Sequence, residues 1–285
     1  MKKILLNCEL PMELLSKSEE LNDYDFILYH LFVKDKDYRR FFSQVMKEGK
    51  RMTILDNSAY EFYRDGGKFD PQTFTEIVEE FNPTYFIVPD VLMDYPETMM
   101  KFRYWSGRLN GHKRMVVPQG KSLKDWLSCY KEMLNKGGFE YIGIPFHNDF
   151  FWDLGTAIYE VLSKHEHLAF KWNADMAYAQ GRCFLLQYLI KEKLIDDSKK
   201  YHLLGCHWAA ELQWLTYRNP MRDEFEWITS MDTSFPVTKG IMKAHLDAGE
   251  KEKISIDEYF RMSLDPEQYN CVIKNIKEFH GYQKN

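Results

Sequence analysis

Several common signatures are missing from this sequence, and each absence removes a class of function. No apolar run approaches the roughly 20 residues that a membrane-spanning helix needs, so no membrane partner is expected. The five cysteines are scattered and form no CxxC pair, which indicates neither a disulfide framework nor a zinc knuckle and fits a reducing cytoplasm. No GxGxxG follows an expected strand, and Gly120-Lys121-Ser122 is only the end of a GxxxxGKS/T loop. We therefore expect no cofactor and no metal.

A basic net charge is missing as well. The formal net charge is −5, and the isoelectric point is about 6.0. A protein that mainly grips nucleic acid is usually basic, so such a role would depend on a local patch. Basic runs occur at residues 34–40, 112–114 and 239–243. Solvated helix faces and turns have the same composition, so these runs alone do not indicate a nucleic-acid surface.

What is present fits one globular domain. The 285 residues are 45% hydrophobic and 28% charged, which excludes a disordered or fibrous chain. No linker, repeat or break in composition divides them, so we expect a single domain over residues 1–285. Aromatic residues make up 16%, a surplus that suits a pocket for planar ligands as well as a core.

Short β-type runs alternate with longer helical patterns along the chain. The expected strands are residues 4–7, 26–31, 52–55, 85–88, 115–118, 141–145, 202–205 and 227–230. The expected helices are residues 38–47, 71–81, 97–105, 123–135, 153–163, 177–193 and 256–277, and residues 222–226 are expected to form a surface loop. Because this alternation builds parallel βαβ units, about eight such runs predict the α/β class and a (β/α)₈ TIM barrel.

Polar residues follow or end four of these strands. Asp56 follows MTIL, and Asp90 follows YFIV and a proline. Gln119 follows RMVVP, and Asp232 follows EWITSM. Because α/β barrels carry their chemistry at the carboxyl ends of the strands, we expect three carboxylates and an amide around one pocket.

Such a set of side chains could exchange a base at a nucleoside. Two carboxyl groups on opposite sides of C1′ can run a double displacement, in which one attacks and the other transfers the proton. The third carboxylate and the amide could bind the donor–acceptor edge of a purine-like base. The ring of Tyr60 could stack on the face of that base, a contact worth roughly 1–3 kcal/mol.

The segments around these residues resemble the tRNA-guanine transglycosylase superfamily, most of all the phage and bacterial DNA 7-deazaguanine transglycosylases. LDNSAYEF is similar to the family's TDSGGYQV, VPDVLMDYP to its AFDE-type strand end with a following YP, and VVPQGKS to its IVQGG. EYIGIP is similar to its strand ending in IGGL, HLLGCHWAAEL to YLMGVGTPEDL, and SMDTSFPV to MFDCVLPT. The six segments occur in the family's order. The resemblance implies a TIM barrel that replaces guanine by a 7-deazaguanine derivative in nucleic acid.

The resemblance also implies a role for each site residue. Asp232 would be the nucleophile that attacks C1′ and leaves a glycosyl-aspartate intermediate. Asp56 would protonate the leaving base and deprotonate the incoming one. Asp90, Gln119 and the backbone amide of Gly143 would bind the edge of the base, and Tyr60 would cover its ring.

The sequence departs from the family at several points. Ser58-Ala59 replaces a pair of glycines, and Ile144-Pro145 replaces a Gly-Leu pair, so that proline removes a backbone donor. The family's glutamate that contacts an aminomethyl group has no clear match, and Asp149 is the nearest candidate. These departures affect the selectivity for the substituent of the deazaguanine.

The zinc-binding subdomain of the tRNA enzymes is not expected. Their CxCxxC motif and histidine after the nucleophile have no counterpart, since only His245, Cys271 and His280 are available downstream. The missing subdomain favours DNA over tRNA as the substrate. The implied location is the cytoplasm, or the host-cell cytoplasm for a phage-encoded protein. The sequence leaves the oligomeric state open.

Other functions stay open from the sequence. One is base exchange at the level of tRNA or of a free nucleoside, which the negative net charge favours. Another is a non-catalytic, transglycosylase-like binding subunit, although such a subunit would have no need of an aspartate at the nucleophile position. A third is an unrelated barrel hydrolase that cleaves small glycosides with the same two carboxylates.

Each site residue also has a plain structural interpretation. The aspartates could form Asx turns or helix caps, and Gln119 could belong to a turn. Cys206-His207 could be a thiol–imidazole pair, but neighbours on a strand point apart. His165-Glu166-His167 could bind a metal, but surface exposure is the simpler interpretation. Trp172 and Arg182 could line a strand-binding groove, but packing is the simpler role.

Overall fold

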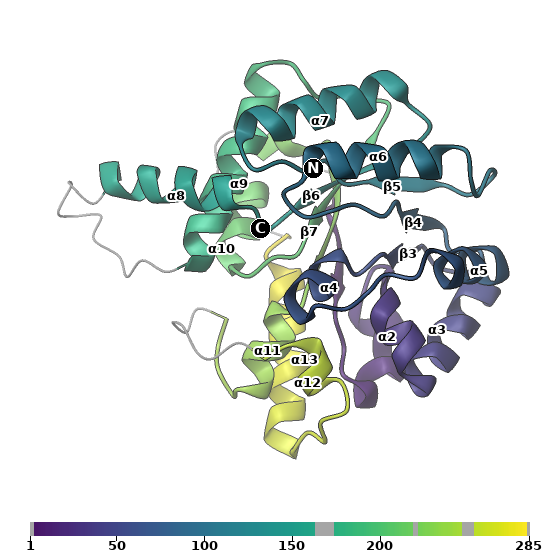
Figure 1. Ribbon diagram of the computed structural model, residues 1–285. Coiled ribbons are helices and arrows are strands. Elements are labelled where there is room, and N and C mark those ends of the chain that lie inside the picture. Colours follow the sequence, from purple (N-terminus) through teal and green to yellow (C-terminus); the bar gives the residue numbers. More distant parts are fainter. Residues whose placement is uncertain (1–2, 163–173, 219–221, 247–253, 284–285) are drawn as a thin grey trace. The chain divides into compact units, whose positions relative to one another are not determined.

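The computed structural model describes residues 3–162, 174–218, 222–246 and 254–283 (Figure 1). These residues form two compact units. The N-terminal unit comprises residues 14–144, and the C-terminal unit comprises residues 1–13 and 145–285. The single domain over residues 1–285 stays a prediction. No helix in the described ranges is both long and apolar enough to cross a membrane.

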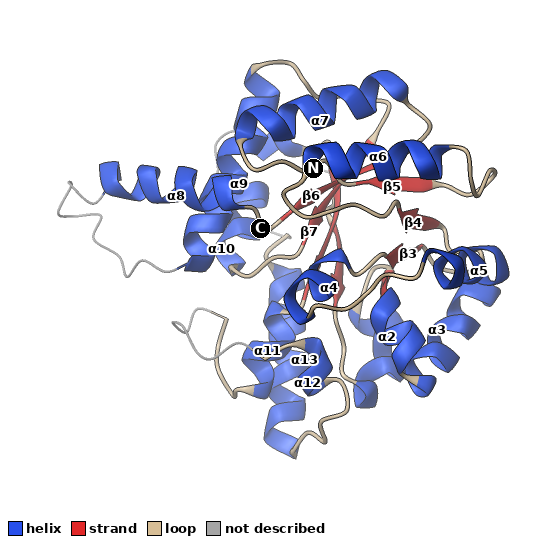
Figure 2. Cartoon of the chain, in the orientation of Figure 1, coloured by secondary structure: helices blue, strands red, loops and turns tan. Residues whose placement is uncertain are grey.

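The fold is a (β/α)₈ barrel of the α/β class, as the sequence predicted. Its eight strands form one sheet in the order β1-β8-β7-β6-β5-β4-β3-β2, and the paired strands within each unit run parallel (Figure 2). The N-terminal unit contributes β2 (Asp25–Leu28), β3 (Thr53–Asp56), β4 (Tyr85–Ile87), β5 (Arg114–Val116) and most of β6 (Tyr141–Pro145). The C-terminal unit contributes β1 (Leu5–Cys8), β7 (Lys200–Leu204) and β8 (Ile228–Thr233).

The long helices of the N-terminal unit begin where the sequence carries a cap. They are α3 (Lys36–Glu48), α5 (Pro71–Phe81), α6 (Tyr95–Ser106) and α7 (Leu123–Lys136), and shorter ones are α1 (Ser18–Leu21), α2 (Tyr29–Lys34) and α4 (Ala59–Asp65). Asp70 accepts a hydrogen bond from the Gln72 amide, and Pro71 occupies the first turn of α5. This cap explains why the predicted bounds of α5 agree with the structure. A 3₁₀ helix, Met12–Lys17, precedes α1.

The predicted strand 26–31 is too long. β2 ends at Leu28, and Tyr29 begins α2. The Leu28 amide donates to the hydroxyl of Tyr38, and the His30 amide donates to Oγ of Ser58, so neither amide continues a strand ladder. A short apolar run does not by itself distinguish a buried strand from a buried helix, which accounts for the error.

The helices of the C-terminal unit follow its strands. They are α8 (Asp149–Leu162), α9 (Ala174–Lys191), α10 (Ala209–Gln213), α11 (Phe235–Ile241), α12 (Ile256–Tyr259) and α13 (Pro266–Gly281), with a π-helical turn at Trp214–Arg218. Helices α11 and α13 pack closely at Gly240, where a Cβ atom would collide with the backbone of Val272. The amide of Asn275 adds a hydrogen bond of 2.9 Å to the carbonyl of Ala244.

One other prediction for the C-terminal unit is wrong, and a second is correct only for the exposure of Glu224 and Glu226. The single helix 256–277 is divided into α12 and α13, because Pro266 starts a new helix behind a capping box of Asp265 and Gln268. The predicted surface loop 222–226 contains a 3₁₀ helix, Arg222–Phe225. Phe225 is buried, and its ring centroid lies 4.8 Å from that of Trp214. The packing of this one apolar side chain explains why a charged segment forms regular structure.

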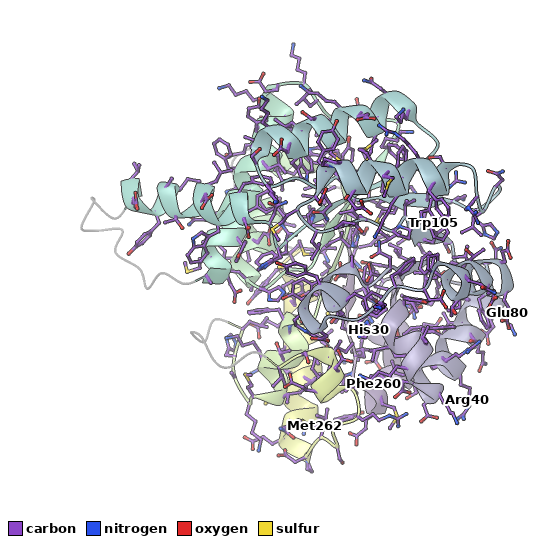
Figure 3. The ribbon with its side chains drawn as sticks, in the orientation of Figure 1. His30, Arg40, Glu80, Trp105, Phe260 and Met262 are labelled. Atoms are coloured by element: carbon purple, nitrogen blue, oxygen red, sulfur yellow. The ribbon has the colours of Figure 1, made fainter. Side chains whose placement is uncertain are left out.

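Aromatic side chains form much of the core of the N-terminal unit. Phe74, on α5, contacts Tyr29, Phe86 and Trp105 edge to face, with ring centroids 5.2–6.1 Å apart (Trp105 is labelled in Figure 3). Such pairs add about 0.5–1.5 kcal/mol each to the area that they bury. The core therefore fixes α5 and α6 against β4, and thereby the loop that begins after β4.

Candidate functional site

The predicted site residues lie at or near the carboxyl ends of their strands. Asp56 is the last residue of β3, and Asp232 lies inside β8, next to its last residue. Asp90 and Gln119 lie three residues beyond β4 and β5 respectively. Asp232 belongs to the C-terminal unit and the others belong to the N-terminal unit. Each unit therefore carries its own group of polar side chains.

Asp90 is the centre of the group in the N-terminal unit. One carboxyl oxygen, Oδ1, accepts a hydrogen bond of 2.7 Å from Nδ2 of Asn57. The other oxygen, Oδ2, accepts one of 2.7 Å from Nε2 of Gln119. Asp90, Asn57 and Gln119 are all buried, and this set is called the Asp90 cluster below. Three consecutive strand ends thus converge on one carboxyl group, as the sequence predicted for two of them.

The amides of the Asp90 cluster are themselves fixed. Oε1 of Gln119 accepts from the backbone amide of Met93 at 3.0 Å, in the loop after β4. Nδ2 of Asn57 also donates to the carbonyl of Val88, and its Oδ1 accepts from the amide of Ala59. These bonds determine which atom of each amide faces Asp90. The carboxyl group is therefore held by two oriented donors, and each of its oxygens retains a further acceptor position.

Burial dominates the electrostatics of Asp90. It raises the pKa of the carboxyl above its ordinary value of 3.8, while the hydrogen bonds from Asn57 and Gln119 oppose the rise. Lys101 donates to the backbone carbonyl of Asp90 at 3.3 Å and also favours the ionised form. A strand-end carboxyl with a perturbed pKa is a candidate binding group for a ligand with hydrogen-bond donors.

Asp56 lies in a tight turn at the end of β3. Its Oδ2 accepts from the amide of Ser58 at 2.7 Å, and Ser58 has a left-handed backbone with φ of 56°. Oγ of Ser58 lies 2.9 Å from Nδ1 of His30 (labelled in Figure 3). The plain interpretation as an Asx turn is thus correct for the backbone. Asp56 is only partly buried, so the turn is compatible with proton transfer by this carboxyl.

Two further predicted residues complete the N-terminal unit. Tyr60 lies on α4, a helix without a single buried residue, and is 42% exposed. Gly143 lies in the middle of β6 and is buried. The exposed ring of Tyr60 can receive a planar ligand, whereas Gly143 offers only backbone atoms.

Asp232 is the centre of a second group, in the C-terminal unit. Its Oδ1 lies 2.9 Å from Nε2 of His202 and accepts from the amide of Gly205 at 3.0 Å. Nδ1 of His202 lies 2.7 Å from Oγ of Ser230. All three side chains are buried, and together with the Gly205 amide they form the Asp232 cluster. Within the described ranges no residue donates a hydrogen bond to the second oxygen, Oδ2.

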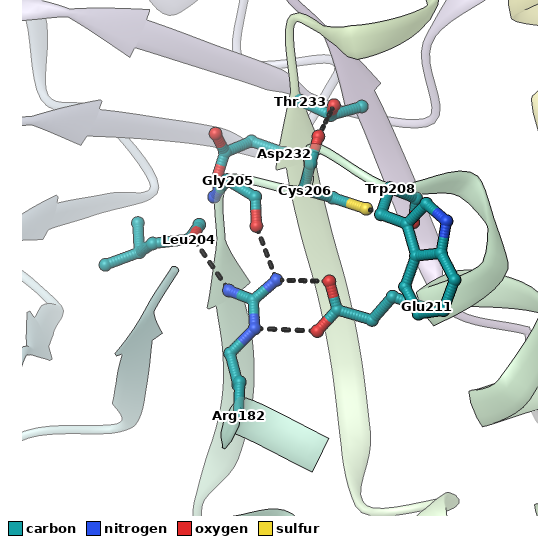
Figure 4. A network of polar contacts seen from close by, with 8 residues as sticks. All are labelled: Arg182, Leu204, Gly205, Cys206, Trp208, Glu211, Asp232 and Thr233. Carbon is teal, nitrogen blue, oxygen red and sulfur yellow. Dashed lines mark hydrogen bonds and ion pairs between the residues drawn. The ribbon is translucent and has the colours of Figure 1, made fainter. Parts of the chain in front are cut away.

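A buried ion pair holds the loop that supplies the Gly205 amide. Arg182 forms two hydrogen bonds of 2.8 Å with Glu211, and both side chains are 0% exposed (Figure 4). The same guanidinium donates to the carbonyls of Leu204 and Gly205, at 2.8 and 2.6 Å. The hydroxyl of Thr233 donates to the carbonyl of Cys206. The backbone between β7 and α10 is therefore fixed on both sides of the amide that Asp232 accepts from.

Arg182 is thus buried, as the expected packing role implies, but it also forms an ion pair and holds two loop carbonyls. No local sequence signal indicates that the partner of Arg182 is Glu211, which lies 29 residues away. His202, Ser230 and Asn57 were missed as well. They lie beside predicted residues, on a strand or in a turn, and a search for polar residues at inward-facing strand positions would have found them.

The remaining candidates within the described ranges do not form a site. Burial raises the pKa of the Cys206 thiol well above its ordinary value, which keeps it neutral, and its Sγ contacts the Trp208 carbonyl rather than His207. His165-Glu166-His167 and Trp172 lie outside the described residues. The described ranges contain no group of three His, Cys, Asp or Glu side chains that could hold a metal ion.

The two clusters offer different chemistry. The Asp90 cluster presents hydrogen-bond acceptors in a buried setting, which suits recognition of a polar edge. The Asp232 cluster presents one carboxyl oxygen that is held and one to which no described residue donates, which suits attack by the second. No protein-family model matches the sequence, and no curated protein matches it, so the chemistry of these clusters is the basis for assigning a function.

Proposed function

We propose that the protein is a base-exchange transglycosylase that replaces guanine by a 7-deazaguanine derivative in a nucleic acid. The observation that carries this proposal is the asymmetry of Asp232. Oδ1 is held by two donors, His202 and the Gly205 amide, while Oδ2 receives no hydrogen bond from the described residues. A carboxylate fixed in this way keeps one oxygen oriented and available as a nucleophile.

The reaction is a double displacement at the anomeric carbon. Oδ2 of Asp232 attacks C1′ as the bond from C1′ to the base nitrogen breaks, and Asp56 gives its proton to the leaving base. Asp56 then takes a proton from the incoming base, whose nitrogen attacks C1′ and releases the carboxylate of Asp232. The mechanism requires both aspartates to act on one substrate, and the variants below test that requirement.

Asp90 supplies the base selection in this proposal. The N1–H and amino group of a guanine-like base are donors, and an ionised carboxylate is an acceptor with room for about four hydrogen bonds. Asn57 and Gln119 use one acceptor position on each oxygen of Asp90. The remaining positions can bind the base, with Tyr60 against its face and the Gly143 backbone beside it. Gln119 acts mainly by orienting Asp90, because its amide already bonds to Met93 and Asp90.

DNA is the favoured polymer, and reaching C1′ in a duplex would require the target base to be flipped out. The net charge of −5 favours the second candidate, exchange at the level of tRNA or of a free nucleoside. Incorporation of radiolabelled guanine into duplex DNA, single-stranded DNA, tRNA and guanosine, assayed in parallel, separates these substrates. Labelling of guanosine alone would contradict the polymer part of the proposal.

The catalytic assignment is tested with Asp232→Ala. We expect this variant to lose exchange and any covalent adduct with the nucleic acid, because no oxygen remains to attack C1′. Asp56→Asn should lose exchange as well, since the leaving base is then not protonated. Lys191→Ala, at an exposed position at the end of α9, is the control and should retain full activity. Full exchange by Asp232→Ala, with a folded protein by circular dichroism, would remove the mechanism.

A further inference from the structure

His202 is the buried side chain that connects the two ends of the Asp232 cluster. It is 0% exposed and lies on β7, where its Nε2 is 2.9 Å from Oδ1 of Asp232 and its Nδ1 is 2.7 Å from Oγ of Ser230. Both ring nitrogens therefore have a polar partner on the neighbouring strand β8. The two contacts satisfy nitrogens that burial would otherwise leave unpaired, and they fix the orientation of the imidazole.

The strand pairing directs this side chain to Asp232. β7 and β8 pair Tyr201 with Ile228 but His202 with Ser230, so the register shifts by one residue between Tyr201 and His202. A register shift changes the direction of the side chains that follow it, as a β-bulge does, and bulges are frequent beside active sites. The shift places the imidazole beside Ser230 and within hydrogen-bond distance of Asp232, two residues farther along β8.

The carboxylate of Asp232 determines which nitrogen of the ring carries the proton. An ionised carboxylate can only accept hydrogen bonds, so Nε2 must carry the proton that it shares with Asp232. In the neutral ring, Nδ1 is then an acceptor, and the Ser230 hydroxyl can donate to it. The contact with Ser230 is thus compatible with the tautomer in which His202 donates to Asp232.

We propose that His202 is a positioning residue for the nucleophile, an inference that rests on the proposed function. It holds Oδ1 of Asp232 together with the Gly205 amide, so that Oδ2 remains oriented toward C1′. The carboxylate of Asp232 loses its charge when it forms the glycosyl ester and regains it when it leaves in the second displacement. The hydrogen bond from His202 stabilises that returning charge. His202 contacts Asp232 and not the reacting carbon.

The test compares variants of His202 in the guanine-exchange assay on a guanine-containing DNA oligonucleotide. His202→Leu removes the donor, and we expect kcat to fall by about 10- to 100-fold with little change in KM, the usual effect of losing one hydrogen bond to a charged group. His202→Gln has an amide nitrogen near the position of Nε2 and should recover part of that loss. Lys200→Ala, on the same strand but exposed, should retain the rate of the unaltered protein.

Rate and fold are separated by two further measurements. Single-turnover formation of the covalent adduct should slow in His202→Leu by the same factor as kcat, whereas a loss due only to unfolding would lower the amplitude and leave the rate unchanged. Two results would overturn the role of His202 but not the proposed function. One is an equal kcat for His202→Leu and the unaltered protein, and the other is an equal loss of kcat in His202→Leu and His202→Gln when both are folded. Absence of exchange and adduct in the unaltered protein would overturn both this role and the proposed function.

Discussion

The ion pair of Arg182 and Glu211 allows a stability prediction that does not depend on any activity. Arg182→Met removes the cation from a carboxylate that is 0% exposed and removes the donors from two loop carbonyls. Burial disfavours the charge of Arg182, yet Glu211 raises the pKa of the guanidinium above its ordinary value, so Arg182 keeps its charge. Breaking one partner of a buried pair costs about 3–5 kcal/mol, and we expect a loss of that size in the free energy of unfolding.

A second variant separates the buried charge from the lost hydrogen bonds. Arg182→Met with Glu211→Leu removes both charges, so only the two loop carbonyls are left without donors, at about 1–3 kcal/mol each. We therefore expect the double variant to be more stable than Arg182→Met alone, with the two single losses adding to more than the double loss. Urea unfolding followed by tryptophan fluorescence measures each value, provided that the m-value does not change.

A surface pair is the matched control. Arg103 and Glu132 approach to 2.7 Å, closer than the buried pair, but their side chains are 59% and 28% exposed. Arg103→Met should therefore change the free energy of unfolding by at most about 1 kcal/mol. The argument that burial decides the cost would be refuted by a loss below about 1 kcal/mol in Arg182→Met, or by a double variant less stable than either single variant.

Two other predictions concern the clusters. Folding raises the pKa of Asp90, so between pH 3.8 and the raised pKa the folded protein binds a proton that the unfolded chain has lost. The free energy of unfolding should therefore fall as pH rises through this range. Asp90→Asn should lack that slope in urea titrations. The opposite slope would contradict the pKa assignment. Gly205 has φ of +67°, so Gly205→Ala should lose roughly 1–2 kcal/mol of stability and, by moving the amide from Asp232, also lower exchange. Gly49→Ala, with φ of +60° at the end of α3, should lose similar stability but keep its exchange rate.

The sequence predicted elements well where local signals were strong. Pro71 behind Asp70 marks the start of α5, and YIGIP forms a buried strand over the predicted residues 141–145. It failed where two structures share one pattern. The apolar run after Asp25 continues into α2, and Pro266 interrupts a helical pattern that otherwise extends from residue 256 to 277.

The candidate site was predicted in part for the same reason. A polar residue directly after an apolar strand is visible in one sequence, and so Asp56, Asp90, Gln119 and Asp232 could be named. Their partners could not, because a partner is defined by distance in space. Nε2 of His202 meets Asp232 across 30 residues of sequence, through a register shift that no local pattern announces.

The sequence by itself determined the alternation of strands and helices, and with it the barrel and the strand ends that carry carboxyl groups, because hydrophobic periodicity and caps act over a few residues. Only the tertiary structure decided that Asn57 and Gln119 hold both oxygens of Asp90, and that one oxygen of Asp232 is held while the other receives no hydrogen bond from the part of the chain that is described. Hydrogen bonds between strands depend on pairing and register, which are properties of the assembled sheet and not of any one segment.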